Sequence, residues 1–424
     1  MGPLDIAVIG CGTAGGAAAL FLARAGHRVS VFEAVKDPGP VGAGIMVQPI
    51  GMRVLARLGL LERILERGSR VERLRCLTTG GRTVLDLAYG DYHPRAFGLG
   101  LHRGVLFEEI FSAVRKEPGV TLRTGHPIED LRVEGRRRRL VEKDGDEHGP
   151  FDLVVVADGA RSQLRDDAPL THREARYPWG ALWFIGDDPD GDFAGTLFQR
   201  VRSTTEMLGL LPSGLGTRGD TPKVSLFWSL RVDEVDAWRK KGLGPWKDHL
   251  RKLEPRSAPV LDQIDSVDEI LFATYWDIVL SPWNTDAVVF LGDAAHATSP
   301  QLGQGANLAL VDAYALARAL GSGAPSLSEA LVAYSRSREA HLGYYQWATR
   351  FVTPFFQSDR TVLAVPRDLF MGLACKLPYV KTRMIRTMCG LERGVLLADP
   401  LPLPDLFTRQ GDDGPDLGVY RTLA

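Results

Sequence analysis

The chain has 424 residues, a formal net charge of −1 and 45% hydrophobic side chains, which is enough for two or three domains of roughly 150 residues each. The balanced charge gives no general attraction to nucleic acid or to an anionic membrane surface, so we expect neither as a partner. The four cysteines lack metal-ligand spacing, which favours reduced thiols in a cytoplasmic protein. No signal-peptide pattern opens the chain, and no apolar run reaches the ~18 residues of a spanning helix.

The first residues of the chain have a βαβ pattern. It predicts a strand at Asp5–Ile9, an Ala/Leu-rich helix at Ala14–Ala25 and a second strand at Arg28–Phe32. The turn Gly10–Gly15 between the first strand and the helix has the pattern G-x-G-x-x-G. Such glycines permit a tight turn, backbone approach to a pyrophosphate, and close packing of helix on strand. The helix N-terminus attracts the phosphates, so we expect a dinucleotide here.

An acidic residue and a second glycine pattern help to test this interpretation. Glu33 ends the second strand, where a carboxylate can accept hydrogen bonds from a ribose. The stretch Gly214–Gly219 matches the same pattern, but it lies between strand-like runs and no helix follows. We predict a hairpin loop there. Cys11, inside the first turn, is interpreted as a small packing residue. Only the N-terminal copy of the glycine pattern is accompanied by a strand, a helix, a second strand and an acidic residue.

Two buried strands and an aromatic sheet are predicted further along the chain. Leu153–Ala157 precedes Asp158-Gly159, and Ala287–Leu291 precedes Gly292-Asp293. Between them, strand-like runs separated by turn signals indicate a mostly antiparallel sheet. These runs are Ala181–Ile185, Thr196–Val201, Glu206–Leu211 and Val224–Leu230. Helical patterns then follow at Ala306–Leu320 and Ser326–Ala348, while Arg136–Arg139 predicts a hairpin with a solvated, charged turn.

Three motifs follow one another along the chain: Gly10–Gly15, Asp158–Ser162 and Gly292–His296, which continues into Pro300–Asn307. Together they resemble the motifs of the class A flavoprotein monooxygenases. This is the para-hydroxybenzoate hydroxylase-like superfamily of FAD-dependent aromatic hydroxylases. The resemblance covers the FAD-binding parts of roughly the first 325 residues. It implies an α/β fold: a Rossmann-like FAD-binding domain (GR2 type), an inserted, mostly antiparallel β-sheet substrate domain and a C-terminal helical region. The expected boundaries are 1–75, 101–170 and 281–325 for the first, 76–100 and 171–280 for the second, and 326–424 for the third.

The resemblance also implies roles for single residues. Asp293 would bind the flavin ribityl hydroxyls, Asp158 lies in a motif associated with FAD and NAD(P)H, and Arg103 would reach the FAD. Gly42–Ile45 would pass over the flavin ring, followed by Gln48. The expected cofactor-binding residues are Gly10, Gly12, Ala14, Gly15, Glu33, Ala34, Gly44, Arg103, Asp158, Asp293, Gly303, Gly305, Ala306 and Asn307.

The stretch from Pro300 to Asn307 would lie beside the isoalloxazine. Gly303 and Gly305 have no Cβ, so backbone can approach a flat ring, and the following helix points its N-terminus at the ligand. Simpler roles stay open for four residues. Asp293 could be only a helix cap and Arg103 a surface ion pair. His296 is interpreted as packing beneath the FAD rather than carrying protons, and Gln48 suits a structural or a functional role equally.

The resemblance implies a two-part reaction. NADH or NADPH reduces the FAD, O2 then adds at C4a, and the flavin hydroperoxide hydroxylates an aromatic or similar electron-rich small molecule. The protein must exclude water and orient the substrate. No second supported fingerprint occurs, so NAD(P)H would bind transiently; an external reductase is the alternative.

Aromatic residues of the middle sheet are candidates for the substrate pocket. Trp179, Ala181 and Trp183 share one strand face, while ordinary sheet core is the plainer interpretation. Further candidates are Phe198, Trp228, Tyr275 and Trp276. The expected catalytic residues are Pro300, Gln48 and Trp183, and the candidates for a substrate-deprotonating base are His102, Tyr177 and Tyr275.

Several alternatives remain open. A flavin reductase or dehydrogenase would share the fold, and so would a non-catalytic FAD-binding sensor. A halogenase is disfavoured because the W-x-W-x-I-P motif is missing. The basic, amphipathic stretch Leu369–Leu391 would suit a quinone-pathway-type hydroxylase of an apolar substrate; otherwise it is a helix packed on the FAD domain or at a homodimer contact.

Overall fold

The computed structural model describes residues 2–40, 42–165, 170–217, 219–394 and 401. Most of the chain beyond residue 394, which belongs to the predicted C-terminal helical region, lies outside these described residues. None of the helices in the described ranges combines the length and apolar character needed to cross a membrane. The fold is α/β and contains one parallel sheet and one large mixed sheet.

The first sheet has five parallel strands, and its middle strand is the predicted N-terminal one. In order, the strands are β17 (Val288–Phe290), β11 (Leu153–Val156), β1 (Asp5–Ile9), β2 (Arg28–Glu33) and β7 (Val120–Thr124). The strands β1, β11 and β17 are buried almost throughout, as expected for a parallel sheet that is covered on both faces. A small antiparallel sheet lies beside it and consists of β8 (Ile128–Glu134), β9 (Arg137–Glu142) and β10 (Glu147–Phe151).

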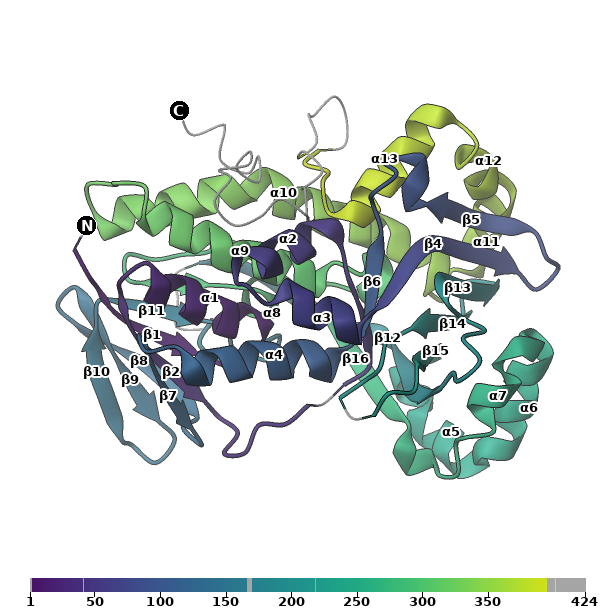
Figure 1. Cartoon of the computed structure of the whole chain (residues 1–424), viewed down its shortest axis with the longest axis horizontal. Helices are drawn as coiled ribbons and strands as arrows, with labels where there is room; N and C mark the ends of the chain where they lie inside the picture. The colour runs from purple at the N-terminus through teal and green to yellow at the C-terminus, as the bar shows by residue number, and fades with distance from the viewer. Residues whose placement is uncertain (1, 41, 166–169, 218, 395–400, 402–424) are drawn as a thin grey trace.

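Three helices pack on one another around the parallel sheet (Figure 1). They are α1 (Thr13–Arg24), α4 (Arg103–Lys116) and α9 (Gly305–Leu320). The long helix α10 (Leu327–Phe356) packs on α9 and extends toward the far half of the molecule. It continues past Ala348, where the sequence predicted its end, because Trp347, Phe351 and Phe355 prolong an apolar stripe at i, i+4 spacing.

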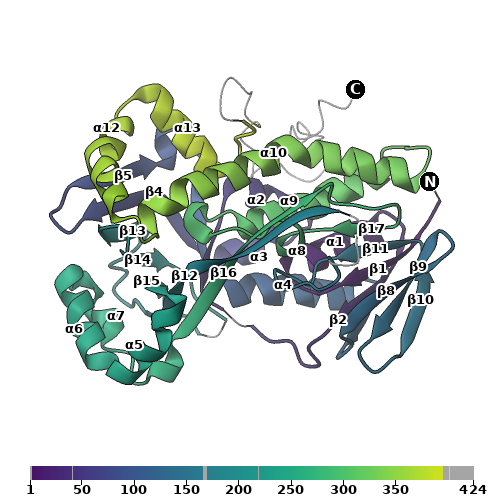
Figure 2. The same cartoon turned by 180° about the vertical axis from the view of Figure 1, so that it is seen from behind.

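The second sheet has nine strands and is almost entirely antiparallel. Its order is β16 (Leu271–Ser281), β12 (Thr171–Asp187), β15 (Lys223–Arg231), β14 (Glu206–Pro212), β13 (Gly195–Arg202), β4 (Ser69–Thr78), β6 (Gly98–His102) and β3 (Gly44–Val47), with β5 (Thr83–Ala88) paired to β4. Only the β13–β4 pair is parallel. The long strands β12 and β16 extend from one half of the molecule to the other (Figure 2). Since β3 and most of β4 fall within 1–75, that segment contributes to both sheets, and the predicted domain boundaries remain a proposal.

Alternation along the strands gives the large sheet two different faces. Leu182 and Leu226 point to one face, where α5 (Val235–Lys241), α6 (Leu243–Leu253) and α7 (Ala258–Leu261) close a hydrophobic cluster. Their sequence neighbours Trp183 and Phe227 point to the opposite face and pack on each other, with ring centroids 4.9 Å apart. This is the period-two pattern of a strand between two apolar layers.

The remaining helices connect or cover these layers. They are α2 (Pro49–Arg57), α3 (Leu61–Arg67), α8 (Asp293–His296), α11 (Ala364–Pro366), α12 (Gly372–Ala374) and α13 (Pro378–Cys389). The stretch Gly214–Gly219 lies in the β14–β15 connection, which confirms the predicted hairpin. The predicted hairpin near Arg136 is also present, although Arg137–Arg139 lies in strand β9 rather than in the turn.

A buried ionic network joins the helices behind the third motif. The Asp312 carboxylate in α9 accepts hydrogen bonds from the backbone N–H of Gly292 (3.0 Å) and from Nε of Arg338 (2.8 Å), and it also binds Nε2 of His296. Burial alone would raise the pKa of Asp312, but the charges of His296 and Arg338 outweigh this effect and hold the pKa at about 2. Burial beside Arg338 also lowers the pKa of His341 to about 3, so neutral His341 accepts from Arg338 and donates to the Gly390 carbonyl.

Replacing Asp312 by Asn should strongly destabilise the protein. The substitution leaves the fully buried Arg338 without its counter-ion, a change that costs about 3–5 kcal/mol. Because the pKa of Asp312 is lowered on folding, wild-type Asp312 contributes fully above about pH 4 and loses its contribution as the pH falls toward 2. We expect a lower urea midpoint for FAD-saturated D312N at pH 7. The control D248N breaks an exposed ion pair with Arg251 and should change stability by less than about 1 kcal/mol; equal effects of both variants would contradict the prediction.

Candidate active site

The three glycine-containing motifs meet where the parallel strands end. A Cβ on Gly10 would lie 2.6 Å from the carbonyl oxygen of Ala157 and 3.0 Å from Cα of Asp158. A Cβ on Gly292 would lie 2.9 Å from Cβ of Ala14. The backbones of the second and third motifs therefore press directly on the first one. Both glycines have positive φ, +90° and +58°, a conformation that a larger residue adopts only with strain.

The helix that follows the first turn offers an anion site. Its N-cap residue, Gly12, has no side-chain cap, and no acidic residue occupies the first turn of α1. The free N–H groups and the helix dipole therefore remain available to phosphate oxygens. A Cβ on Gly12 would meet no protein atom within 4 Å, so the surface above it is open. Ala14 and Gly15 are buried and pack the helix against the strands rather than facing this surface.

Glu33 joins the glycine turn to the loop after β2. Its Oε2 accepts a hydrogen bond from the backbone N–H of Cys11 at 2.8 Å, and Oε1 accepts one from Val35 at 2.9 Å. Ala34, next to it, is exposed. The carboxylate thus lies beside the glycine turn, and its expected role as a ribose ligand stays a prediction. Asp158, two residues after β11, is exposed as a whole residue, but desolvation of its carboxyl raises the pKa to about 6.

A cavity of about 860 Å³ lies between the large sheet and the third motif. The motif side consists of Gly42–Gly44, Arg103, Asp293, Pro300, Gly303, Gly305 and Ala306. The sheet side includes Ala181, Leu197, Met207 and the stacked pair Trp183 and Phe227. The lining does not include Gly10, Gly12, Glu33 or Asp158. The glycine turn and the cavity are therefore two separate parts of the predicted site.

The loop before α9 has the features expected for a flat ring. The N-cap of α9, Gln304, does not cap the helix with its side chain, and the first turn carries no acid. Asp293 is exposed toward the cavity, with Oδ1 3.9 Å from the Cβ position of Gly305. The open N-terminus and the glycines give both a partial positive charge and room for backbone approach. The residues present therefore fit an FAD, and the expected positions of its pyrophosphate near Gly12 and its ring near Gly305 stay predictions.

Gln48 and Asn307 are coupled to each other. The Asn307 side chain is fully buried; its Oδ1 accepts from the backbone N–H of Gln48 (2.7 Å), and its Nδ2 donates to the carbonyls of Met46 and Gly303. These bonds tie the loop over the predicted ring to the start of α9, and the cavity lining excludes Asn307. Gln48 does line the cavity, where Oε1 accepts from the hydroxyl of Tyr89. Tyr89 gave no sequence signal.

The predicted aromatic residues separate by strand face. Trp183 lines the cavity and donates from Nε1 to the hydroxyl of Tyr275 at 3.3 Å. In contrast, Phe198 and Trp228 pack beneath α5–α7, since Trp228 lies opposite Leu182 in the register and shares its face. Trp179 is outside the cavity lining and lies within the irregular pairing of β12 with β16, between Arg176 and Gly180.

Of the three candidate bases, only Tyr275 lines the cavity. Burial raises the pKa of Tyr275 to about 12, so its hydroxyl is protonated at neutral pH and can donate a hydrogen bond. His102 instead caps α4 and accepts from the backbone N–H of Gly104. His296 is buried, binds Asp312 and is absent from the cavity lining; its expected packing beneath the FAD stays a prediction.

The C-terminal helices form a third wall of the cavity. Trp347 and Phe351 of α10, stacked with centroids 5.4 Å apart, line it together with Phe370 and Met371. Several apolar side chains nearby are exposed, including Phe370 at 62%. Phe370 and Met371 belong to the amphipathic stretch that was expected to suit an apolar substrate, whereas Trp347 and Phe351 were not predicted. The i, i+4 spacing of Trp347 and Phe351 was the available signal.

Comparison with known proteins identifies relatives over most of the chain. Residues 3–342 match a family model described as an FAD binding domain. A probable 2-heptyl-3-hydroxy-4(1H)-quinolone synthase of Rhodococcus erythropolis is 30% identical over 78% of this chain and 82% of its own. The 3-hydroxybenzoate 6-hydroxylase of Klebsiella oxytoca is 25% identical, over 81% and 86% of the two chains. The crystal structure of a probable FAD-dependent monooxygenase from Pseudomonas aeruginosa superimposes with a TM-score of 0.73 at 25% identity and covers 86% and 99%.

Replacing Gly12 by Ala should weaken FAD binding without destabilising the fold. Gly12 has a negative φ of −76°, and an added Cβ meets no protein atom, so only the approaching pyrophosphate is obstructed. We expect at least a tenfold loss of FAD affinity in a fluorescence titration of the apoprotein, with an unchanged Tm of that apoprotein. The control G244A lies in α6, where a Cβ also meets nothing, and it should bind FAD normally. An equal loss in both variants, or none in G12A, would argue against this phosphate site.

Proposed function

Because this chain belongs to the class A flavoprotein monooxygenases, FAD-dependent oxidoreductases that include the aromatic hydroxylases, we propose that it consumes NADH or NADPH and O2 to hydroxylate an aromatic or similar electron-rich small molecule. One observation carries this proposal. The cavity is bounded by the third motif on one side and by an aromatic sheet face on the other. A substrate there would lie against the ring end of the cofactor, out of reach of the glycine turn.

The proposed division of roles follows the two parts of the site. Gly12 would lie against the pyrophosphate, while Gly10 and Gly15 would allow the tight turn and the close packing of helix on strand. Glu33 would hold a ribose, and Asp293 with Arg103 would hold the segment between pyrophosphate and ring. When bound, the flavin supplies the redox chemistry: it accepts a hydride from the nicotinamide and transfers oxygen from O2 to the substrate. Pro300 and Gly303–Ala306 would lie beside the ring, and the α9 N-terminus would favour negative charge on it.

The substrate would be held mainly by apolar contacts. Trp183, Phe227, Leu197 and Phe351 supply flat or aliphatic surface, which suits an aromatic ring and excludes water from the reacting atoms. The Tyr275 hydroxyl, with a pKa of about 12, would donate a hydrogen bond to a polar substrate group. Gln48 would keep the loop over the ring in place through Tyr89 and Asn307.

The lining of the cavity favours a substrate with an apolar part. The third motif lines the same ~860 Å³ as the sheet, so a bound flavin ring would fill part of this volume and the substrate would take the remainder. The C-terminal wall is apolar, and the relative with 30% identity is named for a quinolone with a heptyl chain. We therefore propose an aromatic or heteroaromatic substrate that bears an apolar substituent, which is also the kind of substrate expected of a quinone-pathway-type hydroxylase.

Anaerobic reduction followed by isotope labelling tests the reaction. Purified FAD-loaded protein mixed anaerobically with NADH or NADPH, with 2-alkyl-4-quinolones present, should lose its oxidised-flavin absorbance. After O2 is admitted, the product should carry one atom from ¹⁸O2. Bleaching with an unlabelled product would instead identify a reductase or dehydrogenase. Failure of both nicotinamides to reduce the flavin would overturn the single-component proposal.

A cavity variant tests where the substrate binds. The Phe227 ring lies across Gly209, and a Cβ there would approach the ring to 1.9 Å. G209A should therefore push Phe227 into the cavity and raise the KM for a bulky substrate about tenfold, because such an overlap cannot be relieved without displacing the stack on Trp183. FAD content should stay unchanged. The control G244A should leave KM unaltered; a normal KM in G209A would place the substrate elsewhere.

A further inference from the structure

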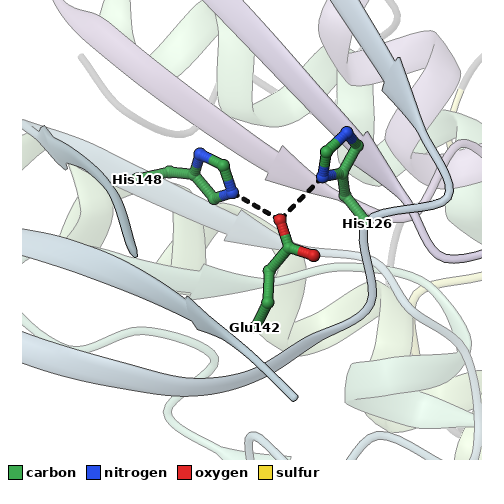
Figure 3. Close-up of side chains that lie close together, drawn as sticks. All are labelled: His126, Glu142 and His148. Carbon is green, nitrogen blue, oxygen red and sulfur yellow. Dashed lines mark hydrogen bonds and ion pairs between the residues drawn. The ribbon is translucent and has the colours of Figure 1, made fainter. Parts of the chain in front are cut away.

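Two histidines and a glutamate lie close together at the small antiparallel sheet, and none of them lines the cavity. Nδ1 of His126 lies 2.6 Å from Oε1 of Glu142, and Nε2 of His148 lies 2.5 Å from the same oxygen. All three potential ligand atoms lie within 4.8 Å of one another. Figure 3 shows both imidazole rings pointing their nitrogens at the one carboxylate. Among the described residues, no other group of histidine, cysteine and acidic side chains meets the same distance criterion.

Three different structural elements supply the ligands. His126 follows β7, Glu142 ends β9, and His148 lies in β10. The backbone N–H of His126 donates to the carbonyl of Glu33 at 3.0 Å, which fixes this loop to the end of β2. Because the elements pair as sheets, the cluster is held in place by backbone hydrogen bonds and does not depend on one flexible loop.

An aromatic ring orients both histidines. The Phe32 ring packs against His148 with a centroid separation of 4.9 Å and against His126 at 6.4 Å. These contacts form an apolar backing on one side of the cluster. On the other side the rings reach solvent, since the side chains of His126 and His148 are 35% and 20% exposed. An ion therefore has an entry path and room for water as a further ligand.

The carboxylate is the group that needs a positive partner. The Glu142 side chain is only 6% exposed, and its Oε1 contacts two imidazoles, neither of which has a fixed charge. A buried charge is usually paired with an opposite charge or coordinates a metal. Two nitrogens and one oxygen match the donor set of a zinc-class divalent ion, whereas Mg²⁺ and Ca²⁺ prefer oxygen alone.

The geometry requires only a small adjustment. Bonds of about 2.0–2.2 Å to a tetrahedral ion separate its ligand atoms by about 3.3 Å. Each imidazole would have to retreat from Oε1 by less than about 1 Å, and both rings have solvent on one side. We propose that His126, Glu142 and His148 bind one divalent ion of the zinc class, with water completing the coordination. The site would clamp the small antiparallel sheet to the end of β2.

Metal titration of the FAD-loaded protein tests this site. After treatment with a chelator and its removal, ZnCl2 should bind with a stoichiometry of one per chain in calorimetry. CoCl2 should give visible d–d bands of a four-coordinate ion, and Zn²⁺ should raise the Tm. H148Q, in which an amide can still donate to Glu142, and E142Q should each bind Zn²⁺ at least tenfold more weakly and lose the rise in Tm.

A matched control uses another histidine–carboxylate pair. His249 lies 3.2 Å from Glu206 on the large sheet, away from the cluster, so H249Q should bind Zn²⁺ like the wild type. If the wild type shows no saturable Zn²⁺ binding, the three side chains form only a hydrogen-bonded cluster, and the proposal is overturned. Equal affinities of wild type and H148Q would overturn it too. The wild-type measurements need no variant to fold, and none of them requires the substrate.

Discussion

The buried carboxylate of Asp312 is the constraint on which the site depends. It binds the backbone of Gly292, the ring of His296 and the guanidinium of Arg338 at once. Through His341 the same network reaches the carbonyl of Gly390, at the end of α13. Charges buried this deeply are tolerated only when their partners are complete. One hydrogen-bonded network therefore connects the third motif, the middle of α9, α10 and the end of α13.

The motifs could be predicted because their chemistry is local. Gly10, Gly12 and Glu33 stand in a short βαβ unit whose strands and helix have strong patterns of their own, and the structure reproduces all three elements. The resemblance to flavoprotein monooxygenases then supplied the order of the later motifs. Asp312 could not be found in this way, because within the α9 sequence it is one polar residue in an apolar helix. Its partners lie 16 to 26 residues away.

The aromatic residues show a different limit of prediction. Trp183 and Trp228 look equivalent in sequence, yet the first lines the cavity and the second lies under α5–α7. The sheet face that each tryptophan occupies depends on the register between β12 and β15. In this register Trp183 is opposite Phe227, and Leu182 is opposite Trp228. A shift of one residue would exchange the two faces. Register is a property of the pairing between strands, so neither strand alone reveals which aromatic residue faces a ligand.

The two ends of the site consist of different chemical groups. At the glycine turn, backbone N–H groups and a helix dipole would contact the cofactor, so the constraint is the absence of side chains and appears in the sequence as glycine. At the cavity, side chains from the large sheet, α10 and the C-terminal helices supply the wall. Any apolar residue of suitable size can contribute there, and such walls tolerate substitution. It follows that short motifs can predict the cofactor and the reaction class. Substrate preference instead depends on the shape of a cavity wall that brings together residues more than 150 positions apart, such as Trp183 and Phe351.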